Sequence, residues 1–353
     1  MRRLGLGLTA WLCGALPALA QSDSGAELFH SGGAGTARLA GGQVVVPAAR
    51  FPCANCHGAS GMGRAEGATR LPPVTWAALT DPTRVGGAHD PTSFARLLRE
   101  GLRPDGTEIL SLMPRYDLTD GEIRDLVAFL QGLEAKALQG IFPRELSLPI
   151  PSDPAFAQGL IAAMDALNDR GGAYGRRITL VEDEAQAVAG RTLFEMIDGA
   201  VRDAEHDALV GRLHADGVMR VAAPGATPDL LSRLERAGVS LDPGAEVILL
   251  SQDVAVSVQG KDVYLSHAIL RHAGARTLDG ARALTVALPQ DARVSEMVAA
   301  RRPGNEIDGF VAGLALAEGI VRSGRRLTGE ELIEETLRAA AALPIELVAT
   351  TRP

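Results

Sequence analysis

Apolar residues in the later part of the chain follow two alternating patterns. From residue 154 onward, amphipathic stretches with helical spacing are separated by short apolar runs that have the length of buried strands. The helical stretches are residues 156–168, 228–237, 263–272, 306–323 and 329–341, and the strand-like runs are residues 178–181, 218–222, 247–250, 254–258 and 283–288. Strands that alternate with helices predict an α/β domain with a largely parallel sheet.

The earlier part of the chain has a different pattern. Helical spacing is found at residues 24–30 and 93–100, and residues 44–47 are strand-like. Glycine and proline are dense between residues 58 and 91, which predicts loops with short helical pieces. Thr119 and Glu122 have the spacing of a capping box, and the apolar residues from 123 to 133 share one face. A longer helix is therefore expected to begin there.

A proline-rich stretch separates the two patterns. Residues 140–154 contain four prolines and show little periodicity. We therefore expect two domains, at residues 21–139 and 140–353, with the boundary near Gln139. The alternative is a loop inside a single domain, because Ile141 and Leu146 are apolar and could pack.

The first 20 residues have the features of a secretory signal peptide. Two arginines precede an uncharged apolar run at residues 4–16, and Ala18 and Ala20 occupy the small positions that a signal peptidase reads. The run is shorter than the roughly 20 residues that span a bilayer. We expect cleavage after Ala20 and export to the periplasm, with Cys13 removed in the signal; the alternative is an uncleaved anchor.

The charge of the chain narrows the choice of partners. The sequence has 35 Lys+Arg and 43 Asp+Glu, a formal charge of −8 that becomes −10 once the two arginines of the signal are removed. Nucleic-acid binding requires a basic surface, so it is not expected. An acidic chain suits docking to a basic patch on a partner protein. No later apolar run is long enough for a transmembrane helix.

The two cysteines of the mature chain lie in one short motif, Cys53-Ala54-Asn55-Cys56-His57. Each thiol of such a motif can add to a vinyl group of a haem, and the adjacent histidine is then held beneath the iron as its proximal ligand. The sequence therefore predicts one covalently attached haem c. Cys53 and Cys56 would attach it, and His57 would ligate the iron.

Three other interpretations of the motif are weaker. A zinc site needs four ligands, and no second cysteine pair exists in the mature chain. A thioredoxin-like redox motif belongs in a βαβ unit, whereas this motif lies in a stretch rich in glycine and proline. A disulfide across two residues would constrain little.

The iron needs a sixth ligand, and six methionines remain outside Met1. Met62 follows His57 too closely to reach the opposite face of a haem, and four others belong to the second domain. Met113 is therefore the expected ligand, and its thioether would stabilise ferrous iron and raise the potential. The alternatives are that Met113 is a core residue and that His89, or no side chain, takes the sixth position.

Residues from about 25 to 133 resemble a class I mono-haem cytochrome c domain. The features that match are Gly25-Ala26-Glu27-Leu28-Phe29, Cys53-x-x-Cys56-His57-Gly58, Met113-Pro114-x-Tyr116 and the final amphipathic helix. The resemblance implies a small all-α fold in which the first and last helices cross and one haem edge is exposed. The segment from residue 32 to 51 is longer than the minimal family pattern.

The same resemblance implies further haem contacts. A proline carbonyl after the motif is expected to accept the hydrogen bond of the His57 ring, with Pro73 as the candidate and Pro72 next. Trp76 and Tyr116 are expected near the porphyrin, and both could equally be core residues.

Residues from about 148 to 350 resemble the type I periplasmic solute-binding proteins of the branched-chain amino-acid-binding kind. The matches lie at residues 159–183 and 309–341, the two ends of that family's sequence. The domain is shorter than a full two-lobed binding protein, and residues 204–224 have no run of Ser and Thr that could contact a ligand. No ligand-binding residue is therefore carried over, and we expect a scaffold that has lost solute binding.

These features predict an electron carrier and not an enzyme. We expect one-electron transfer between periplasmic redox proteins, with a periplasmic dehydrogenase, by resemblance of the quinoprotein alcohol dehydrogenase type, as the donor. The alternative is a solute-binding or sensing protein in which the haem reports the redox state, with an unknown small-molecule ligand. A haem peroxidase of the di-haem kind would need a second Cys-x-x-Cys-His motif, which the sequence lacks.

Overall fold

A computed structural model describes residues 23–39, 43–66, 69–110, 112–251, 256–266, 278, 281–300, 302–325 and 327–350. The predicted signal peptide lies outside these residues. The chain forms two compact units, Met1–Lys136 and Ala137–Pro353. The division falls in the last turn of a helix, three residues before the expected boundary at Gln139.

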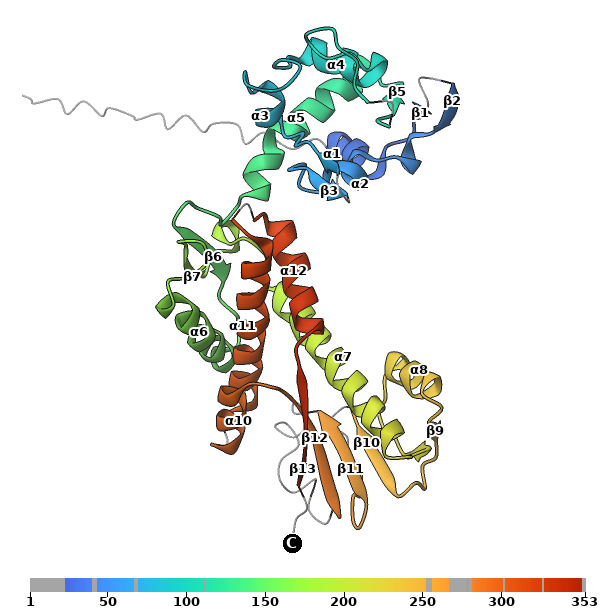
Figure 1. Ribbon diagram of the computed structural model, residues 1–353, viewed down its shortest axis with the longest axis vertical. Helices are drawn as coiled ribbons and strands as arrows, with labels where there is room; N and C mark the ends of the chain where they lie inside the picture. The colour runs from blue at the N-terminus through green and yellow to red at the C-terminus, as the bar shows by residue number, and fades with distance from the viewer. Residues whose placement is uncertain are drawn as a thin grey trace, which may run out of the picture. The chain divides into compact units, whose positions relative to one another are not determined.

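Unit 1 is built from short helices around a small core (Figure 1). Its helices are α1 (Asp23–Ser31), α2 (Cys53–His57), α3 (Trp76–Thr80), α4 (Pro91–Glu100) and α5 (Asp120–Ala137). Helices α1 and α5, the first and the last, pack through Phe29 and Phe129, whose ring centroids are 5.4 Å apart. The predicted capping box opens α5, because the Thr119 backbone N–H donates to the Glu122 carboxylate (2.7 Å) and the Glu122 N–H donates to the Thr119 hydroxyl (3.2 Å).

The expectation that this unit is all-α is wrong in detail. Strands β1 (Thr36–Leu39), β2 (Val44–Pro47) and β5 (Arg115–Tyr116) form an antiparallel sheet in the order β2-β1-β5, and β3 (Arg64–Glu66) pairs with β4 (Thr69–Leu71). The apolar run at 44–47 was expected as a strand, and a strand needs a partner for its backbone groups. Residues 36–39 supply that partner, with Ala37 fully buried.

Unit 2 contains a four-stranded sheet and a separate group of helices. Strands β10 (Val247–Leu250), β11 (Asp262–Ser266) and β12 (Ala283–Pro289) are parallel, and β13 (Ile345–Thr350) is antiparallel to β12. A parallel pair, β6 (Glu145–Pro149) with β7 (Arg177–Val181), stands apart from this sheet. A second parallel pair, β8 (Arg220–Val221) with β9 (Ser240–Leu241), is joined to β10 by a parallel bridge between Ala222 and Ile248. The largely parallel α/β architecture expected for this part is therefore present.

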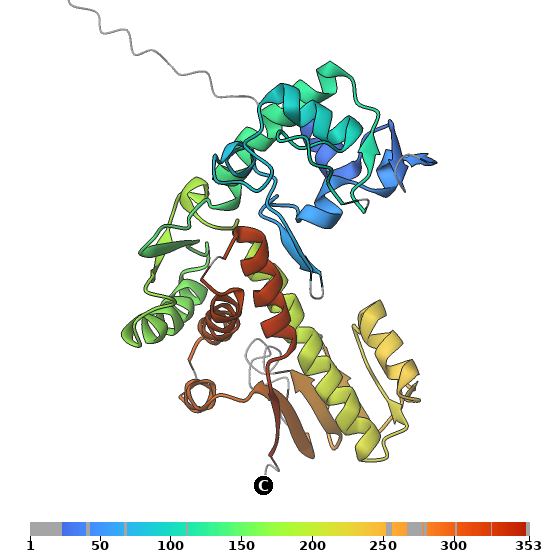
Figure 2. The same ribbon diagram turned by 45° about the horizontal axis from the view of Figure 1, so that its top comes forward.

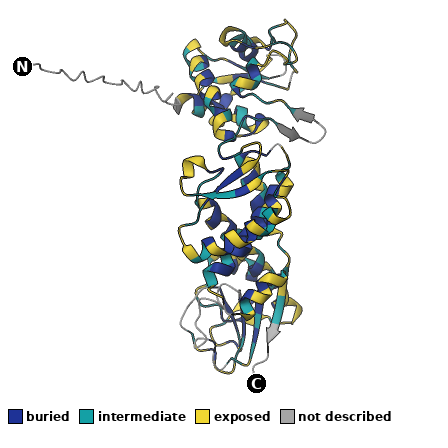
Figure 3. Cartoon of the chain, turned by 90° about the vertical axis from the view of Figure 1, so that its left-hand side faces the viewer, coloured by how far each residue is buried: buried dark blue, intermediate teal, exposed yellow. Residues whose placement is uncertain are grey.

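The long helix α7 (Thr192–Ala215) runs along both parts of unit 2 (Figures 1 and 2). Its first half packs with α6 (Pro154–Asp169), α11 (Gly304–Ser323) and α12 (Gly329–Ala341) in one apolar core. Its second half and α8 (Pro228–Arg236) cover one face of the sheet through Leu209, Leu213 and Leu234. The short helix α10 (Ala292–Ala299) precedes α11. Figure 3 shows the buried residues of these helices in dark blue.

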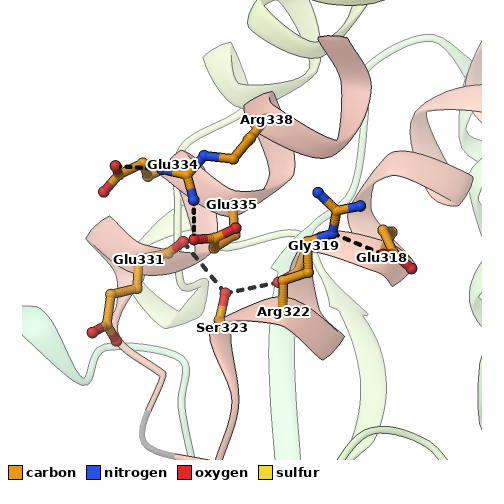
Figure 4. A network of polar contacts seen from close by, with 8 residues as sticks. All are labelled: Glu318, Gly319, Arg322, Ser323, Glu331, Glu334, Glu335 and Arg338. Atoms are coloured by element: carbon orange, nitrogen blue, oxygen red, sulfur yellow. Dashed lines mark hydrogen bonds and ion pairs between the residues drawn. The ribbon is translucent and has the colours of Figure 1, made fainter. Parts of the chain in front are cut away.

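Helix α12 begins and ends at the predicted residues and is tied to α11 by polar contacts (Figure 4). The Ser323 hydroxyl bonds to the carbonyl oxygens of Gly319 (2.8 Å) and Glu331 (3.3 Å). On the outer face of α12, Arg338 pairs with Glu334 at 2.8 Å and also with Glu335. These exposed ion pairs contribute little to stability, so the buried face of the helix holds it in place.

The predicted helix at 263–272 is wrong where the structure describes it, because residues 262–266 form the strand β11. This strand lies between β10 and β12, so Val263 and Leu265 are buried on one face and Tyr264 on the other. A strand buried on both faces is a continuous apolar run, which periodicity alone cannot distinguish from a buried helix. The predicted strand at 254–258 lies partly outside the described residues, and residues 256–258 form no strand.

Candidate haem-binding site

The Cys-x-x-Cys-His motif forms the single helical turn α2, which begins after Pro52 and ends at Gly58. Cys53 and Cys56 are both free thiols; Cys53 packs against the core of unit 1, and Cys56 is exposed. Burial raises the pKa of the Cys53 thiol to about 12, so this thiol is protonated at neutral pH. The helical turn therefore carries two thiols that are three residues apart, and His57 follows the second one directly.

His57 is buried, and its Nδ1 lies 2.9 Å from the carbonyl oxygen of Pro72. A carbonyl can only accept, so Nδ1 carries the proton and Nε2 keeps its lone pair. Burial lowers the pKa of His57, against the opposing effect of the Pro72 carbonyl. The neutral imidazole is thus the favoured form, and it is the form that ligates a metal ion.

The acceptor is Pro72 and not Pro73, which was the expected residue. The Pro73 carbonyl instead accepts a hydrogen bond from Nη1 of Arg84 (3.1 Å). Gly63 packs directly on this segment with a φ of +84°, and a Cβ there would lie 2.5 Å from the Leu71 carbonyl oxygen. Only glycine therefore lets the segment approach closely enough to His57 for the Pro72 carbonyl to be used.

Met113 lies just before β5, and Tyr116 is the last residue of that strand. Met113 is half-buried and packs against the same core as Cys53 and Trp76. The Tyr116 hydroxyl donates to the carbonyl oxygen of Phe51 (2.7 Å), just before α2. Burial raises the pKa of Tyr116, so its hydroxyl stays protonated and can donate this bond. The Met113 segment is thus tied through Tyr116 to the residues that precede the motif.

Trp76 and His89 both meet the ring of Phe94 edge-to-face. Trp76 opens α3 and meets the ring of Phe94 edge-to-face, with centroids 5.7 Å apart. His89 is buried, and its Nδ1 has no hydrogen-bond partner among the described residues. Burial lowers the pKa of His89, and the charge of Arg84 lowers it further. His89 is therefore neutral at pH 7 and keeps a nitrogen without a partner.

Arg84 was not singled out in the sequence. Its Nη1 donates both to Pro73 and to the carbonyl oxygen of Ala78 (3.0 Å), in the last turn of α3. The only local signal is the preceding Asp81 and Thr83, which form a turn through the Asp81 carboxylate (2.7 Å). Nothing in that signal indicates where the Arg84 side chain goes.

The donor set fits a covalently held haem. Two free thiols and a neutral histidine lie on one helical turn, and a thioether lies on the other segment that packs against the same core. Among the described residues, no group of three or more His, Cys, Asp and Glu side chains could hold a bare metal ion.

Comparison with known families agrees with this donor set. Residues 40–134 match the family model described as Cytochrome c. This segment is a cytochrome c domain. A cytochrome c domain implies covalent haem and electron transfer. No match was found among curated proteins.

Several solved structures are similar to part of this chain. An ABC transporter substrate-binding protein from Desulfitobacterium hafniense is 15% identical, with a TM-score of 0.36, over 60% of this chain and 98% of its own. A putative branched-chain amino acid ABC transporter from Rhodospirillum rubrum is 16% identical, with a TM-score of 0.35, over 55% of this chain and 89% of its own. An extracellular ligand-binding receptor from Verminephrobacter eiseniae is 11% identical, with a TM-score of 0.34, over 54% of this chain and 87% of its own.

Both resemblances noted in the sequence thus recur in these comparisons. The TM-scores of the solved structures are low, so the fold of unit 2 rests on its own sheet topology. Loss of solute binding by this unit stays a prediction. Within the described part of the chain, every helix is too short or too polar to cross a membrane.

Proposed function

We propose that this chain carries one haem, attached through Cys53 and Cys56 and ligated by His57 and Met113, and that it transfers single electrons between redox proteins in the periplasm. When bound, the haem supplies a one-electron iron couple. Each thiol adds its S–H across one vinyl double bond, so no atom is released. The observation that carries the proposal is the hydrogen bond between His57 Nδ1 and the Pro72 carbonyl. Because Nδ1 holds the proton in this bond, the lone pair of Nε2 is available to ligate iron.

The other residues hold this arrangement. The Pro72 carbonyl orients the His57 ring and makes its Nε2 a stronger donor. The Tyr116 hydroxyl, bonded to Phe51, fixes the segment of Met113 relative to the motif. If His57 and Met113 both ligate the iron as proposed, no coordination position would be left for a substrate, which favours a carrier over an enzyme. The dehydrogenase donor follows only from resemblance.

The experiment compares optical spectra of the oxidised and reduced full-length protein with those of Met113→Ala. The wild type is expected to be low-spin, with a Met–iron charge-transfer band that Met113→Ala lacks. The reduction potential of Met113→Ala should also be lower than that of the wild type, because the lost thioether ligand stabilises ferrous iron. Met62→Ala is the matched control: Met62 lies five residues after His57 and should leave the band and the potential unchanged.

Two results would contradict this assignment. A high-spin wild-type protein that binds carbon monoxide readily would show an open sixth position. A band that survives in Met113→Ala, with the spectrum changed instead in His89→Ala, would move the ligand to His89.

A further inference from the structure

Arg84 is a half-buried cation whose described contacts are all with carbonyl oxygens. In the described part of unit 1, the ion pairs are Arg38–Asp117 and Arg99–Asp120, and Arg84 belongs to neither. Its Nη1 donates to Pro73 (3.1 Å) and Ala78 (3.0 Å). Among the described residues the guanidinium therefore has no ion-pair partner, and the charges that act on it are the attracting Asp81 carboxylate and the repelling Arg103.

The backbone of Arg84 is held on both sides. Its N–H donates to the carbonyl oxygen of Asp81 (3.0 Å), and its own carbonyl accepts from Gly87 (3.0 Å). The Asp81 carboxylate accepts from both the N–H and the hydroxyl of Thr83 (2.7 Å each), which closes the turn before it. The side chain thus extends from a rigid turn, and little entropy is lost when it reaches Pro73.

The segment that Arg84 contacts cannot hold itself by backbone donors. Pro72 and Pro73 both lack an N–H, so the pair can be fixed only through its carbonyls and its neighbours. Val74 donates to Gly61 (2.8 Å) on one side, and Arg84 binds the Pro73 carbonyl. The Pro72 carbonyl, which directly precedes these two anchors in the chain, is the one that accepts from His57.

The charge of Arg84 is also placed near the imidazole. Arg84 binds the Pro73 carbonyl, and the adjacent Pro72 carbonyl accepts from His57. A positive charge in this position disfavours the extra positive charge of oxidised iron bonded to that ring. Positioning and charge therefore act on the same ligand.

We propose that Arg84 is a positioning residue for His57 and that its charge raises the reduction potential of the haem, an inference that rests on the proposed function. The carbonyl bonds of Arg84 keep Pro72 in line with Nδ1, and the guanidinium charge favours the reduced state. Neither role places Arg84 in contact with the iron.

The test measures reduction potentials of full-length Arg84→Gln and Arg84→Lys. Glutamine keeps a donor but no charge, so the one-electron equilibrium should shift about tenfold toward the oxidised form, where tenfold equals 59 mV for one electron. Lysine keeps the charge, and most of the potential should be retained. Arg99→Gln is the control, because Arg99 also bonds a carbonyl (Leu118, 2.9 Å) but is already paired with Asp120.

The lysine variant also provides a test within one protein. Raising the pH through the titration of the introduced ammonium group, near its ordinary pKa of about 10.4, removes the charge and should lower the potential in this variant but not in the wild type. This measurement decides the matter if the glutamine variant fails to keep its haem.

Three results would overturn the inference: an unchanged potential in Arg84→Gln, an equal fall in both Arg84 variants, or the same pH profile in the lysine variant and the wild type. Each can occur while the wild type shows covalent haem and the Met–iron band, so it would leave the proposed function intact. Failure of the wild type to show that spectrum would instead reject the proposed function.

Discussion

Helices α6 and α11 of unit 2 cross closely at two glycines, one on each helix, and each glycine packs against the backbone of the other helix. A Cβ at Gly159 would lie 1.8 Å from the carbonyl oxygen of Glu306, and a Cβ at Gly309 would lie 1.9 Å from that of Phe156. Both obstacles are backbone atoms, so no side chain can rotate away. We therefore predict that Gly159→Ala and Gly309→Ala each force the two helices apart.

The size of the effect follows from these distances. Ordinary van der Waals contact begins at 3.4 Å, whereas the added Cβ at Gly309 would lie 1.9 Å from the Phe156 oxygen. The helices must therefore separate locally by roughly 1.5 Å. That gap removes dispersion contacts from neighbours such as the fully buried Leu160 and Leu316. Overpacking of this kind costs up to about 3 kcal/mol, and alanine returns about 1 kcal/mol of helix propensity, so each variant should lose about 2 kcal/mol.

The double variant should lose less than the sum of the two single losses. The first methyl group already separates the helices at this crossing, which leaves room for the second. Non-additivity is thus a sharper sign of one shared contact than either single value.

Urea unfolding of the full-length protein, followed by far-UV circular dichroism, measures these losses. Haem absorbance follows unit 1 at the same time, so a change confined to unit 2 can be recognised. The matched control is Gly211→Ala on α7, where an added Cβ meets nothing within 4 Å and the residue is exposed. This control should gain about 1 kcal/mol. If Gly159→Ala or Gly309→Ala were as stable as the control, the close crossing of α6 and α11 would be refuted.

Two further predictions concern one buried group in each unit. Burial lowers the pKa of His206 below its ordinary 6.5, with Asp203 opposing and Arg233 adding to the shift. The unfolded chain therefore binds the proton more tightly, and stability should fall as pH drops below 6.5, by at most about 1.4 kcal/mol per pH unit. His206→Phe should flatten this part of the urea-midpoint profile, and an unchanged slope would disprove the assignment. In unit 1, Tyr116→Phe leaves the Phe51 carbonyl without its 2.7 Å donor and should cost about 1 to 3 kcal/mol in haem-monitored unfolding; no loss would mean that the bond adds nothing.

The elements that could be predicted from sequence are those whose signals are local. The capping box of Thr119 and Glu122 forms at the start of α5, and α12 occupies residues 329–341 as expected. A capping residue and an amphipathic stripe act within a few turns, so the rest of the chain cannot easily override them. The grouping of the two thiols with His57 could be predicted in the same way, because a single helical turn places them together.

Elements that depend on distant partners were missed or misassigned. Helix α7 was not predicted, because it packs against two different cores: Leu193 and Ile197 contribute to one, and Leu209 and Leu213 to the other. The apolar stripe of such a helix changes partners along its length, and two glycines interrupt its propensity. The strand β11 was read as helix because its sheet neighbours bury both of its faces.

The choice between Pro72 and Pro73 shows where sequence reasoning about the site ends. Two adjacent carbonyls follow the motif, and spacing along the chain does not distinguish them. The decision is made by contacts from elsewhere: Gly63 packs closely against Pro72, and Arg84 binds the Pro73 carbonyl. Once Pro73 is engaged, Pro72 is the carbonyl left for His57. Gly63 and Arg84, which no pattern in the motif indicates, thus favour Pro72 as the acceptor, and Arg84 also brings its charge near the histidine that this acceptor orients.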